Sequence, residues 1–460
     1  MGLSTRTRRG GPAASTPKAP APTIADGVHA VGDAPPGSVA QALRPLAAAV
    51  AGDPLPIRME AWDGSAIGPT DGLGTIRVTP RALRRFLWSP DQLGLGRAFV
   101  AGDLELNGDL LVLLRELEGV DHRDLRFTAR ALARSLPALR LPGVLGWPLP
   151  PPPEEIRPRG RRHSIHRDRT VVRHHYDVGN DFYEIVLGRA MTYSCARFAS
   201  PRTDLAAAQA DKHELICRKL GLHEQPGHRL LDVGCGWGSL ALHAARHHGA
   251  HVVGITISRE QAQRAQERVR QAGLQDTVEI RLQDYRGLAG EQFDAIASVG
   301  MFEHVGTRRM RQYFEVLRGL LVPTGRLLNH AISSVGGSRL DGRSFVHRYV
   351  FPDGELIDVG EVVLGMERAG FQVRDVESLR EHYARTLRAW VANLQDGWDR
   401  AVEIVGPNRA RVWLLYMAAS ALHFEDGGID LHQVLGVVPA ADGTARMPRT
   451  RDGWSTADPR

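Results

Sequence analysis

The chain has 460 residues, enough for two or three domains with a sizeable core, and 43% hydrophobic and 24% charged residues are typical of a globular protein. A net charge of +6 favours anionic partners, either nucleic acid or an anionic membrane surface. The three cysteines are widely spaced and odd in number, so we expect no CxxC metal pair and a reducing compartment. No apolar run of 18 residues occurs, so neither a membrane span nor a usual secretory signal is expected.

The first part of the chain changes composition at about residue 37. Residues 1–33 are rich in Ala, Pro, Ser and Thr, which predicts a disordered tail. Residues 37–121 predict a small α+β accessory domain, with helices over 39–51 and 80–88 and a strand over 74–78. We interpret this domain as a packing or dimerisation unit without chemistry of its own, which leaves a homodimer open.

Residues 122–170 are expected to form a basic, Pro-rich linker. Twelve arginines stand against five acidic residues between Asp121 and His175. The segment 127–136 places apolar side chains on one helical face, a pattern typical of a helix lying on an anionic bilayer. A solvated interdomain linker is the alternative. Aromatic residues do not interleave with the arginines of this helical segment, so nucleic-acid binding is not expected.

Residues 171–438 alternate strand patterns with helical patterns, and residues 439–460 are expected to form a C-terminal tail. The predicted helices include 260–272 and 307–321, and the predicted strands are 230–233, 251–256, 278–285 with its loop, 293–299 and 325–332. This alternation predicts an α/β fold with a doubly wound, mainly parallel sheet. Glu303 and His330 follow or end neighbouring strands, so we expect both at the same ligand-binding edge.

A glycine-rich turn follows the first of these strands. The segment from Asp232 to Gly238 ends a strand and precedes a helix, as in a nucleotide-binding βα turn. Glycines let a ligand approach the backbone, although a plain strand-turn-helix is the alternative. The next strand ends at Thr256, where an NAD-binding fold would carry an acid. With Asp232 placed to face an amino group, this favours S-adenosylmethionine and a Rossmann-like class I methyltransferase fold.

Six further segments resemble those of a known enzyme family. They are HHYDVGNDFY at 174–183, MTYSCA at 191–196, GITISREQ at 254–261, GMFEHVG at 300–306, YVFPDG at 349–354 and HYARTLRAW at 382–390. Together with the glycine turn they resemble the cyclopropane fatty acid synthases, which include mycolic acid cyclopropane synthases and fatty acid C-methyltransferases. The resemblance implies methyl transfer from S-adenosylmethionine to a cis double bond in an unsaturated phospholipid acyl chain. A carbocation would then be deprotonated by bound bicarbonate.

The resemblance also implies roles for individual residues. Those implied to hold bicarbonate are Cys195, Glu303, His330, Ile332 through its backbone, and Tyr383. Those implied to contact S-adenosylmethionine are Tyr176, Tyr193, Ser194, Asp232, Gly234, Gly236, Thr256, Ile257, Gln261, Asp284 and Tyr285. Among them, Thr256, Ile257 and Gln261 are implied to lie near the ribose, and Asp284 and Tyr285 near the adenine. Three have structural alternatives, with Cys195 as a small buried side chain, His330 as a satisfied core histidine and Tyr383 as a packed tyrosine. No metal ligand is expected.

The sequence leaves the product open. Ring closure would give a cyclopropane fatty acid, whereas a hydride shift before deprotonation would give a 10-methylene chain for a separate flavin-dependent reductase. We expect a cytoplasmic enzyme peripherally associated with the inner face of the cell membrane, with membrane phospholipids as partners. The alternative is an S-adenosylmethionine-dependent methyltransferase acting on a small molecule or RNA.

Overall fold

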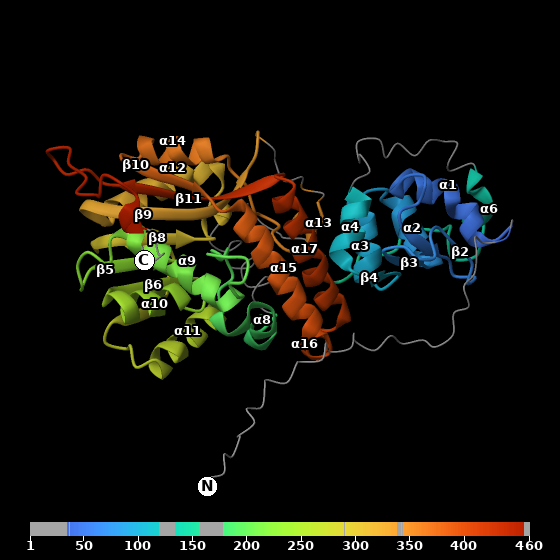
Figure 1. Ribbon diagram of the computed structural model, residues 1–460, viewed down its shortest axis with the longest axis horizontal. Coiled ribbons are helices and arrows are strands. Elements are labelled where there is room, and N and C mark those ends of the chain that lie inside the picture. The colour runs from blue at the N-terminus through green and yellow to red at the C-terminus, as the bar shows by residue number, and fades with distance from the viewer. Residues whose placement is uncertain are drawn as a thin grey trace, which may run out of the picture.

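The computed structural model describes residues 35, 37–118, 134–156, 178–288, 290–337, 342 and 344–454. We call residues 178–454 the C-terminal unit and residues 37–118 with 134–156 the N-terminal unit. Figure 1 shows the C-terminal unit on the left and the N-terminal unit on the right, with the long helices α15 (Arg380–Asp396) and α17 (Pro407–Glu425) of the C-terminal unit on the side nearest the N-terminal unit.

A seven-stranded sheet forms the centre of the C-terminal unit. Its strands are β5 (Arg229–Val233), β6 (His251–Thr256), β7 (Val278–Leu282), β8 (Phe293–Val299), β9 (Leu321–Ser334), β10 (Gln372–Ser378) and β11 (Ile429–Val437). The strand order is β10-β11-β9-β8-β5-β6-β7. Strands β5 to β9 pair in parallel, whereas β11 is antiparallel to both of its neighbours. The predicted mainly parallel sheet is confirmed, and β10 and β11 extend it beyond the five predicted strands.

Helices cover both faces of this sheet. One face carries α9 (Leu205–Leu220), α10 (Ser239–His248) and α11 (Arg259–Gln271), and the other carries α12 (Met310–Gly319) and α14 (Val359–Arg368) (Figure 1). Each face has its own buried apolar cluster. The predicted doubly wound architecture is therefore confirmed.

Local sequence signals set the ends of the helices near the predicted site. Helix α9 begins after Asp204, whose carboxylate accepts a hydrogen bond from the Ala207 N–H, and ends at Gly221 with φ 78°. Helix α11 begins after Ser258, whose hydroxyl accepts from the Gln261 N–H. Side-chain caps and a left-handed glycine satisfy backbone groups that a helix end leaves free.

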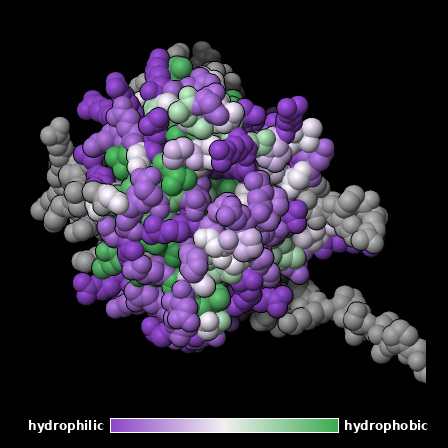
Figure 2. All heavy atoms as spheres, turned by 90° about the vertical axis from the view of Figure 1, so that its left-hand side faces the viewer, coloured by the Kyte–Doolittle hydropathy of each residue, from purple (hydrophilic) through white to green (hydrophobic). Residues whose placement is uncertain are grey.

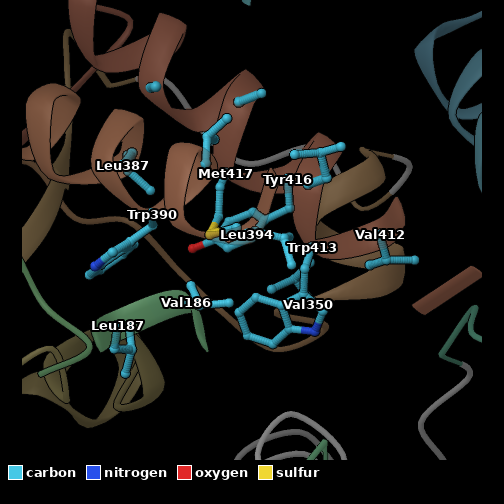
Figure 3. Close-up of a cluster of buried hydrophobic side chains, with 14 of the residues drawn as sticks. Val186, Leu187, Val350, Leu387, Trp390, Leu394, Val412, Trp413, Tyr416 and Met417 are labelled. Atoms are coloured by element: carbon cyan, nitrogen blue, oxygen red, sulfur yellow. The ribbon is translucent and has the colours of Figure 1, made fainter. Parts of the chain in front are cut away.

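A helical block packs against one end of the sheet. It consists of α8 (Asn180–Leu187), α15, α16 (Trp398–Val405) and α17. Figure 3 shows Trp390 and Leu394 of α15, Trp413 and Met417 of α17 and Val186 of α8 gathered in one buried cluster. The rings of Tyr193 and Trp390 lie 5.2 Å apart at its edge. The block thus supplies a wall of aromatic and aliphatic side chains beside the sheet.

The N-terminal unit has a sheet of its own, with strand order β2-β1-β3-β4. Its elements are α1 (Val39–Ala51), β1 (Arg58–Glu60), β2 (Ala66–Ile67), β3 (Gly74–Val78), α2 (Pro80–Trp88), α3 (Gln92–Val100), β4 (Leu104–Gly108) and α4 (Leu110–Glu118). Helices α3 and α4 pack on α17, and Arg115 of α4 pairs with Glu425 of α17. Helices α1 and α2 span the residues predicted for them.

Parts of the predicted linker and C-terminal tail pack against the two units. Residues 134–156 include the short helix α6 (Leu136–Leu139), and Leu139 and Val144 are buried in the core of the N-terminal unit. Trp454 is buried against the C-terminal unit, where the Arg326 guanidinium donates to the carbonyl of Arg446. The predicted tail 1–33 and most of the predicted basic helix, 127–133, lie outside the described residues. Within the described ranges, no helix is both long and apolar enough to cross a membrane.

Candidate active site

The glycine turn lies between β5 and α10, as predicted. Gly234 and Gly238 have φ of 76° and 78°, a conformation that residues with side chains rarely adopt. A Cβ at Gly234 would approach the side chain of Met301 to 3.2 Å. The N–H groups of Gly234 and Cys235 donate to the carbonyl of Ile255 at 2.9 and 3.0 Å. The turn is therefore held by its backbone, close to the end of β6.

A cavity of about 170 Å³ lies above this turn, between the carboxyl ends of the strands and the segment before α9. Ten of the eleven predicted cofactor residues line it: Tyr193, Ser194, Asp232, Gly234, Gly236, Thr256, Ile257, Gln261, Asp284 and Tyr285. The eleventh, Tyr176, lies outside the described residues. The fold thus brings four separate chain segments to one cavity.

Two buried titratable side chains, Asp232 and Lys212, line the cavity next to the glycine turn. Asp232 is 2% exposed, and burial raises its pKa to about 7 although the nearby Lys212 ammonium opposes the shift. Lys212 is 1% exposed, and burial lowers its pKa to about 7. Its ammonium donates to the Ser194 hydroxyl at 3.0 Å. One carboxylate oxygen of Asp232, Oδ2, is buried and has no hydrogen-bond partner in the described chain.

The unpartnered Oδ2 of Asp232 fits the amino group of S-adenosylmethionine, which the sequence predicts at this position. A buried carboxylate oxygen without a partner is costly unless a ligand donates to it. The ammonium of the methionine part of S-adenosylmethionine is such a donor, and the open backbone at Gly236 leaves room beside it. The residues at this end of the cavity therefore fit S-adenosylmethionine.

Polar side chains from β6 and α11 line the next part of the cavity. The Thr256 hydroxyl donates to Oε1 of Gln261 at 2.9 Å and accepts from the N–H of Ser258 at 3.2 Å. The described residues of 255–261 that line the cavity include no acidic side chain, whereas an NAD-binding fold would place one there. Thr256, Ile257 and Gln261 form the part of the cavity wall that the family resemblance predicts to lie near the ribose.

The predicted adenine end contains an ion pair. Asp284 accepts from Nε and Nη2 of Arg286 at 2.8 and 2.6 Å, so its carboxylate is already engaged by a guanidinium. Tyr285 is buried, and its ring meets that of Tyr313 edge-on at 5.1 Å. Asp284 would therefore contact an adenine together with Arg286, a residue that the sequence reasoning did not single out.

A second group of titratable residues lies behind the cavity wall. Oε1 of Glu303 accepts from the backbone N–H of Ile332 at 2.8 Å, and burial raises the pKa of Glu303 to about 7. His330 is fully buried, its Nδ1 lies 3.2 Å from Nε2 of Gln433, and burial lowers its pKa well below the usual value. Oε2 of Glu303 and Nε2 of His330 are buried without a partner among the described residues. Only one ring nitrogen of His330, Nδ1, therefore has a hydrogen-bond partner among the described residues.

The other two predicted catalytic side chains, Cys195 and Tyr383, are also buried. Cys195 is buried, its thiol lies 3.7 Å from the carbonyl of Leu379, and burial raises the pKa of the thiol. Tyr383 is 7% exposed and packs against Phe424 with ring centroids 4.7 Å apart. Neither residue lines the cofactor cavity, and Glu303, His330 and Ile332 do not line it either.

The sequence reasoning missed three buried polar residues near these groups. Lys212 continues the buried stripe of α9 formed by Ala208 and Leu215, and a lysine at an apolar position was the signal available. Tyr416 donates or accepts at 3.4 Å with Tyr193, and burial raises its pKa to about 12. Gln433 holds His330 from β11, a strand that was not predicted.

Comparisons with known proteins agree with this arrangement. A profile described as mycolic acid cyclopropane synthetase matches residues 163–434. A probable fatty acid methyltransferase of Mycobacterium tuberculosis is 44% identical over 417 residues, covering 87% of this chain and 95% of the relative. A tuberculostearic acid methyltransferase of the same organism is 34% identical over 401 residues, covering 82% and 87%.

A solved structure extends the likeness to three dimensions. The mycolic acid cyclopropane synthase CmaA1, complexed with SAH and CTAB, superposes with a TM-score of 0.55 at 33% identity. The match covers 58% of this chain and 98% of that chain. With a fold, a cavity and a profile match that agree, this chain belongs to the mycolic acid cyclopropane synthetase family and is an S-adenosylmethionine-dependent methyltransferase of the cyclopropane synthase type.

Proposed function

We propose that this enzyme transfers the methyl group of S-adenosylmethionine to a carbon of a cis double bond in an unsaturated phospholipid acyl chain. The observation that carries the proposal is the position of the cofactor cavity, which lies between the glycine turn and the buried cluster of the helical block. The cofactor supplies an electrophilic methyl group when bound. The chain supplies a dry environment, which an alkene needs because it is a weak nucleophile.

The buried cluster of the helical block supports an acyl chain as the substrate. Tyr193 lines the cofactor cavity and packs against Trp390 and Trp413 at 5.2 and 5.8 Å. These side chains belong to the same buried cluster as those labelled in Figure 3. Aromatic faces stabilise a nearby positive charge, so this wall suits a carbocation formed on an apolar chain.

We propose that this carbocation is deprotonated next to the predicted catalytic residues behind the cavity wall. Glu303, His330, Cys195, Tyr383 and the backbone of Ile332 would hold bicarbonate, which supplies a base when bound. Two observations support a small polar ligand, namely the unpartnered Oε2 of Glu303 and Nε2 of His330. The Ile332 N–H already donates to Glu303. It could donate to bicarbonate only if the Glu303 carboxylate shares or releases this hydrogen bond. Near neutral pH, Glu303 is partly protonated and can donate to an anion.

We favour a 10-methylene chain as the product, with a cyclopropane as the alternative. Relatives that match across more than four fifths of this chain are named as methyltransferases, one of them for tuberculostearic acid. A 10-methylene product would be consumed by a separate flavin-dependent reductase that yields a 10-methyl chain.

A surface of the N-terminal unit supports action on membrane lipids. Trp147, Leu145 and Trp88 are 84, 61 and 56% exposed, although such side chains are usually buried. They lie together, since Trp88 donates to the carbonyl of Gly146 at 2.9 Å and Arg84 donates to that of Trp147. Exposed tryptophans beside arginines suit an anionic lipid interface.

The opposite end of the molecule has a different surface. Figure 2 shows that end of the C-terminal unit covered mainly by hydrophilic side chains, with small hydrophobic areas between them.

The three cysteines of the C-terminal unit are free thiols, which fits a reducing compartment. We therefore propose peripheral association with the inner face of the cell membrane, through the Trp88–Trp147 surface.

Lipid analysis of a bacterial host that makes this protein and is supplied with oleate tests the proposal. We expect phospholipid acyl chains heavier than oleate by one CH₂, and derivatisation that locates the added carbon separates a 10-methylene chain from a cyclopropane. The Glu303→Gln variant, made at the same level, should give neither product. Unchanged acyl chains with the wild-type protein would contradict the proposal and favour a small-molecule or RNA substrate.

A further inference from the structure

A cluster of metal-ligating side chains lies between α9 and α10, away from the cofactor cavity. One ligand atom from each of Cys217, His243 and His248 lies within 4.8 Å of the others. Oε2 of Glu214 lies 3.1 Å from Nε2 of His243 and 2.9 Å from Nε2 of His248. We propose that these four side chains form a zinc site that joins the two helices. The proposal does not depend on the enzyme's substrate.

The spacing of the donor atoms is close to that of a tetrahedral zinc site. Zinc binds nitrogen at about 2.0 Å and sulfur at about 2.3 Å, so two ligand atoms on one ion stand roughly 3.3 to 3.7 Å apart. The observed separations of up to 4.8 Å therefore require the side chains to close by roughly an ångström. Side-chain rotations within a helix pair can provide such a shift.

The chemistry of the donors favours zinc over hard cations. A thiolate and two imidazoles suit a borderline-soft ion, whereas magnesium and calcium prefer oxygen ligands alone. With the Cys217 thiolate and the Glu214 carboxylate, a Zn²⁺ centre would carry no net charge, which suits a buried position. Burial lowers the pKa of His243 to about 4, so its imidazole is neutral near pH 7 and can bind a metal. Burial raises the pKa of the Cys217 thiol, and binding would release its proton.

An ion could reach this cluster from the surface. A cavity of about 260 Å³ between α9 and α10 is lined by His213, His243 and His247. The imidazole rings of His243 and His247 lie 4.5 Å apart there. His243 thus faces both the cavity and the cluster.

The position of the cluster gives such an ion a structural role. Glu214 and Cys217 follow Lys212 on α9, and His248 ends α10, the helix that begins at the glycine turn. A metal would therefore fix the two helices that carry the cofactor cavity relative to each other. The alternative is a metal-free network, in which Glu214 accepts from both histidines and from Nε of Arg218 at 2.6 Å.

Metal analysis of the full-length protein distinguishes the zinc site from the metal-free network. We expect about one zinc ion per chain after purification from zinc-supplemented cells, and a lower unfolding temperature after removal with a chelator. Replacement by Co²⁺ should give a thiolate-to-cobalt charge-transfer band. Cys217→Ser should abolish that band, and His248→Gln should lower the zinc content to well below one per chain.

His251→Gln provides a matched control, because His251 is an exposed histidine at the start of β6, outside both the ligand set and the cavity beside it. It should keep the zinc content and the band. If wild-type protein contains no zinc and gives no band with Co²⁺, or if His248→Gln and His251→Gln retain the ion equally, the zinc site is wrong and the hydrogen-bonded network is correct. The comparison of the two histidine variants stands even if Cys217→Ser does not fold.

Discussion

A buried carboxylate of the N-terminal unit and three side chains of the C-terminal unit differ in how their polar atoms are paired. In the N-terminal unit the buried Asp103 is held by Nε of the buried Arg85 at 2.7 Å. In the C-terminal unit Asp232, Glu303 and His330 each keep a buried polar atom without a partner in the part of the chain that the structure describes. Paired charges support a fold, whereas unpaired groups with shifted pKa values are typical of sites that bind or react. From this difference we expect Asp103 to support the fold, and the three side chains of the C-terminal unit to bind a ligand or react.

The largest expected effect comes from the carboxyl of Glu303, whose Oε2 has no hydrogen-bond partner among the described residues. Glu303→Gln keeps the shape but removes the acid, so we expect the rate of methyl transfer to fall by about 100-fold or more. Radiolabelled S-adenosylmethionine and unsaturated phospholipid vesicles measure that rate. Glu315→Gln, on the exposed side of α12, should leave the rate unchanged. A Glu303→Gln enzyme with full activity would contradict a role for this carboxyl in the reaction.

The same carboxyl should make stability depend on pH. Burial raises the pKa of Glu303 from 4.5 to about 7, so the folded state binds a proton more tightly than the unfolded state. The free energy of unfolding of the wild type, relative to Glu303→Gln, should therefore fall as pH rises from about 4.5 to about 7, by roughly 1 to 3 kcal/mol. Denaturant unfolding of both proteins across this range measures the difference. A difference that is constant with pH would show that folding does not raise the pKa of Glu303.

A smaller effect is expected at the buried lysine of the cofactor cavity. Lys212→Met removes the hydrogen bond to Ser194 and the positive partner of Asp232, so the Kd for S-adenosylmethionine should rise by about tenfold or more. Calorimetric titration measures it.

The matched control is Lys219→Met, at the other buried lysine of α9, which pairs with Asp375 at 2.8 Å and does not line the cavity. It should reduce stability without changing cofactor affinity. An unchanged Kd in Lys212→Met would mean that the Asp232 end of the cavity does not hold the charged part of the cofactor.

The exposed tryptophan of the N-terminal unit should matter for lipid binding only. Trp147→Ala is expected to weaken binding to anionic phospholipid vesicles roughly tenfold, because one large apolar side chain no longer enters the interface. Vesicle co-sedimentation measures the binding. Leu364→Ala removes an exposed apolar side chain from α14 of the C-terminal unit and should have no effect. Equal losses in both variants would place the lipid contact elsewhere.

The smallest effect is expected where the two units meet. Glu425 of α17 pairs with Arg115 of α4 and with Arg388 of α15, and all three side chains are partly exposed. Arg115→Met should therefore lower the free energy of unfolding by no more than about 1 kcal/mol. Chemical denaturation measures it. A loss of several kcal/mol would mean that this ion pair, and not apolar packing of α3 and α4 on α17, holds the units together.

The sequence by itself determined the central architecture and one side of the site. The strand-glycine-helix pattern around Gly234 and the alternation of strands and helices predicted the parallel part of the sheet, because both signals are local. Residues such as Thr256 and Asp284 follow parallel strands, whose carboxyl ends must share an edge. Their common cavity was therefore predictable from their positions along the chain.

Only the tertiary structure decided which buried groups lack partners. Lys212 comes from α9 and meets Asp232 of β5, and Gln433 of β11 meets His330 of β9 through an antiparallel pairing that no local pattern announced. The folded positions of the linker residues 134–156 and of Trp454 also depend on distant partners. Burial and pairing depend on contacts between residues far apart in the chain, and these contacts set the pKa values of Asp232 and Glu303.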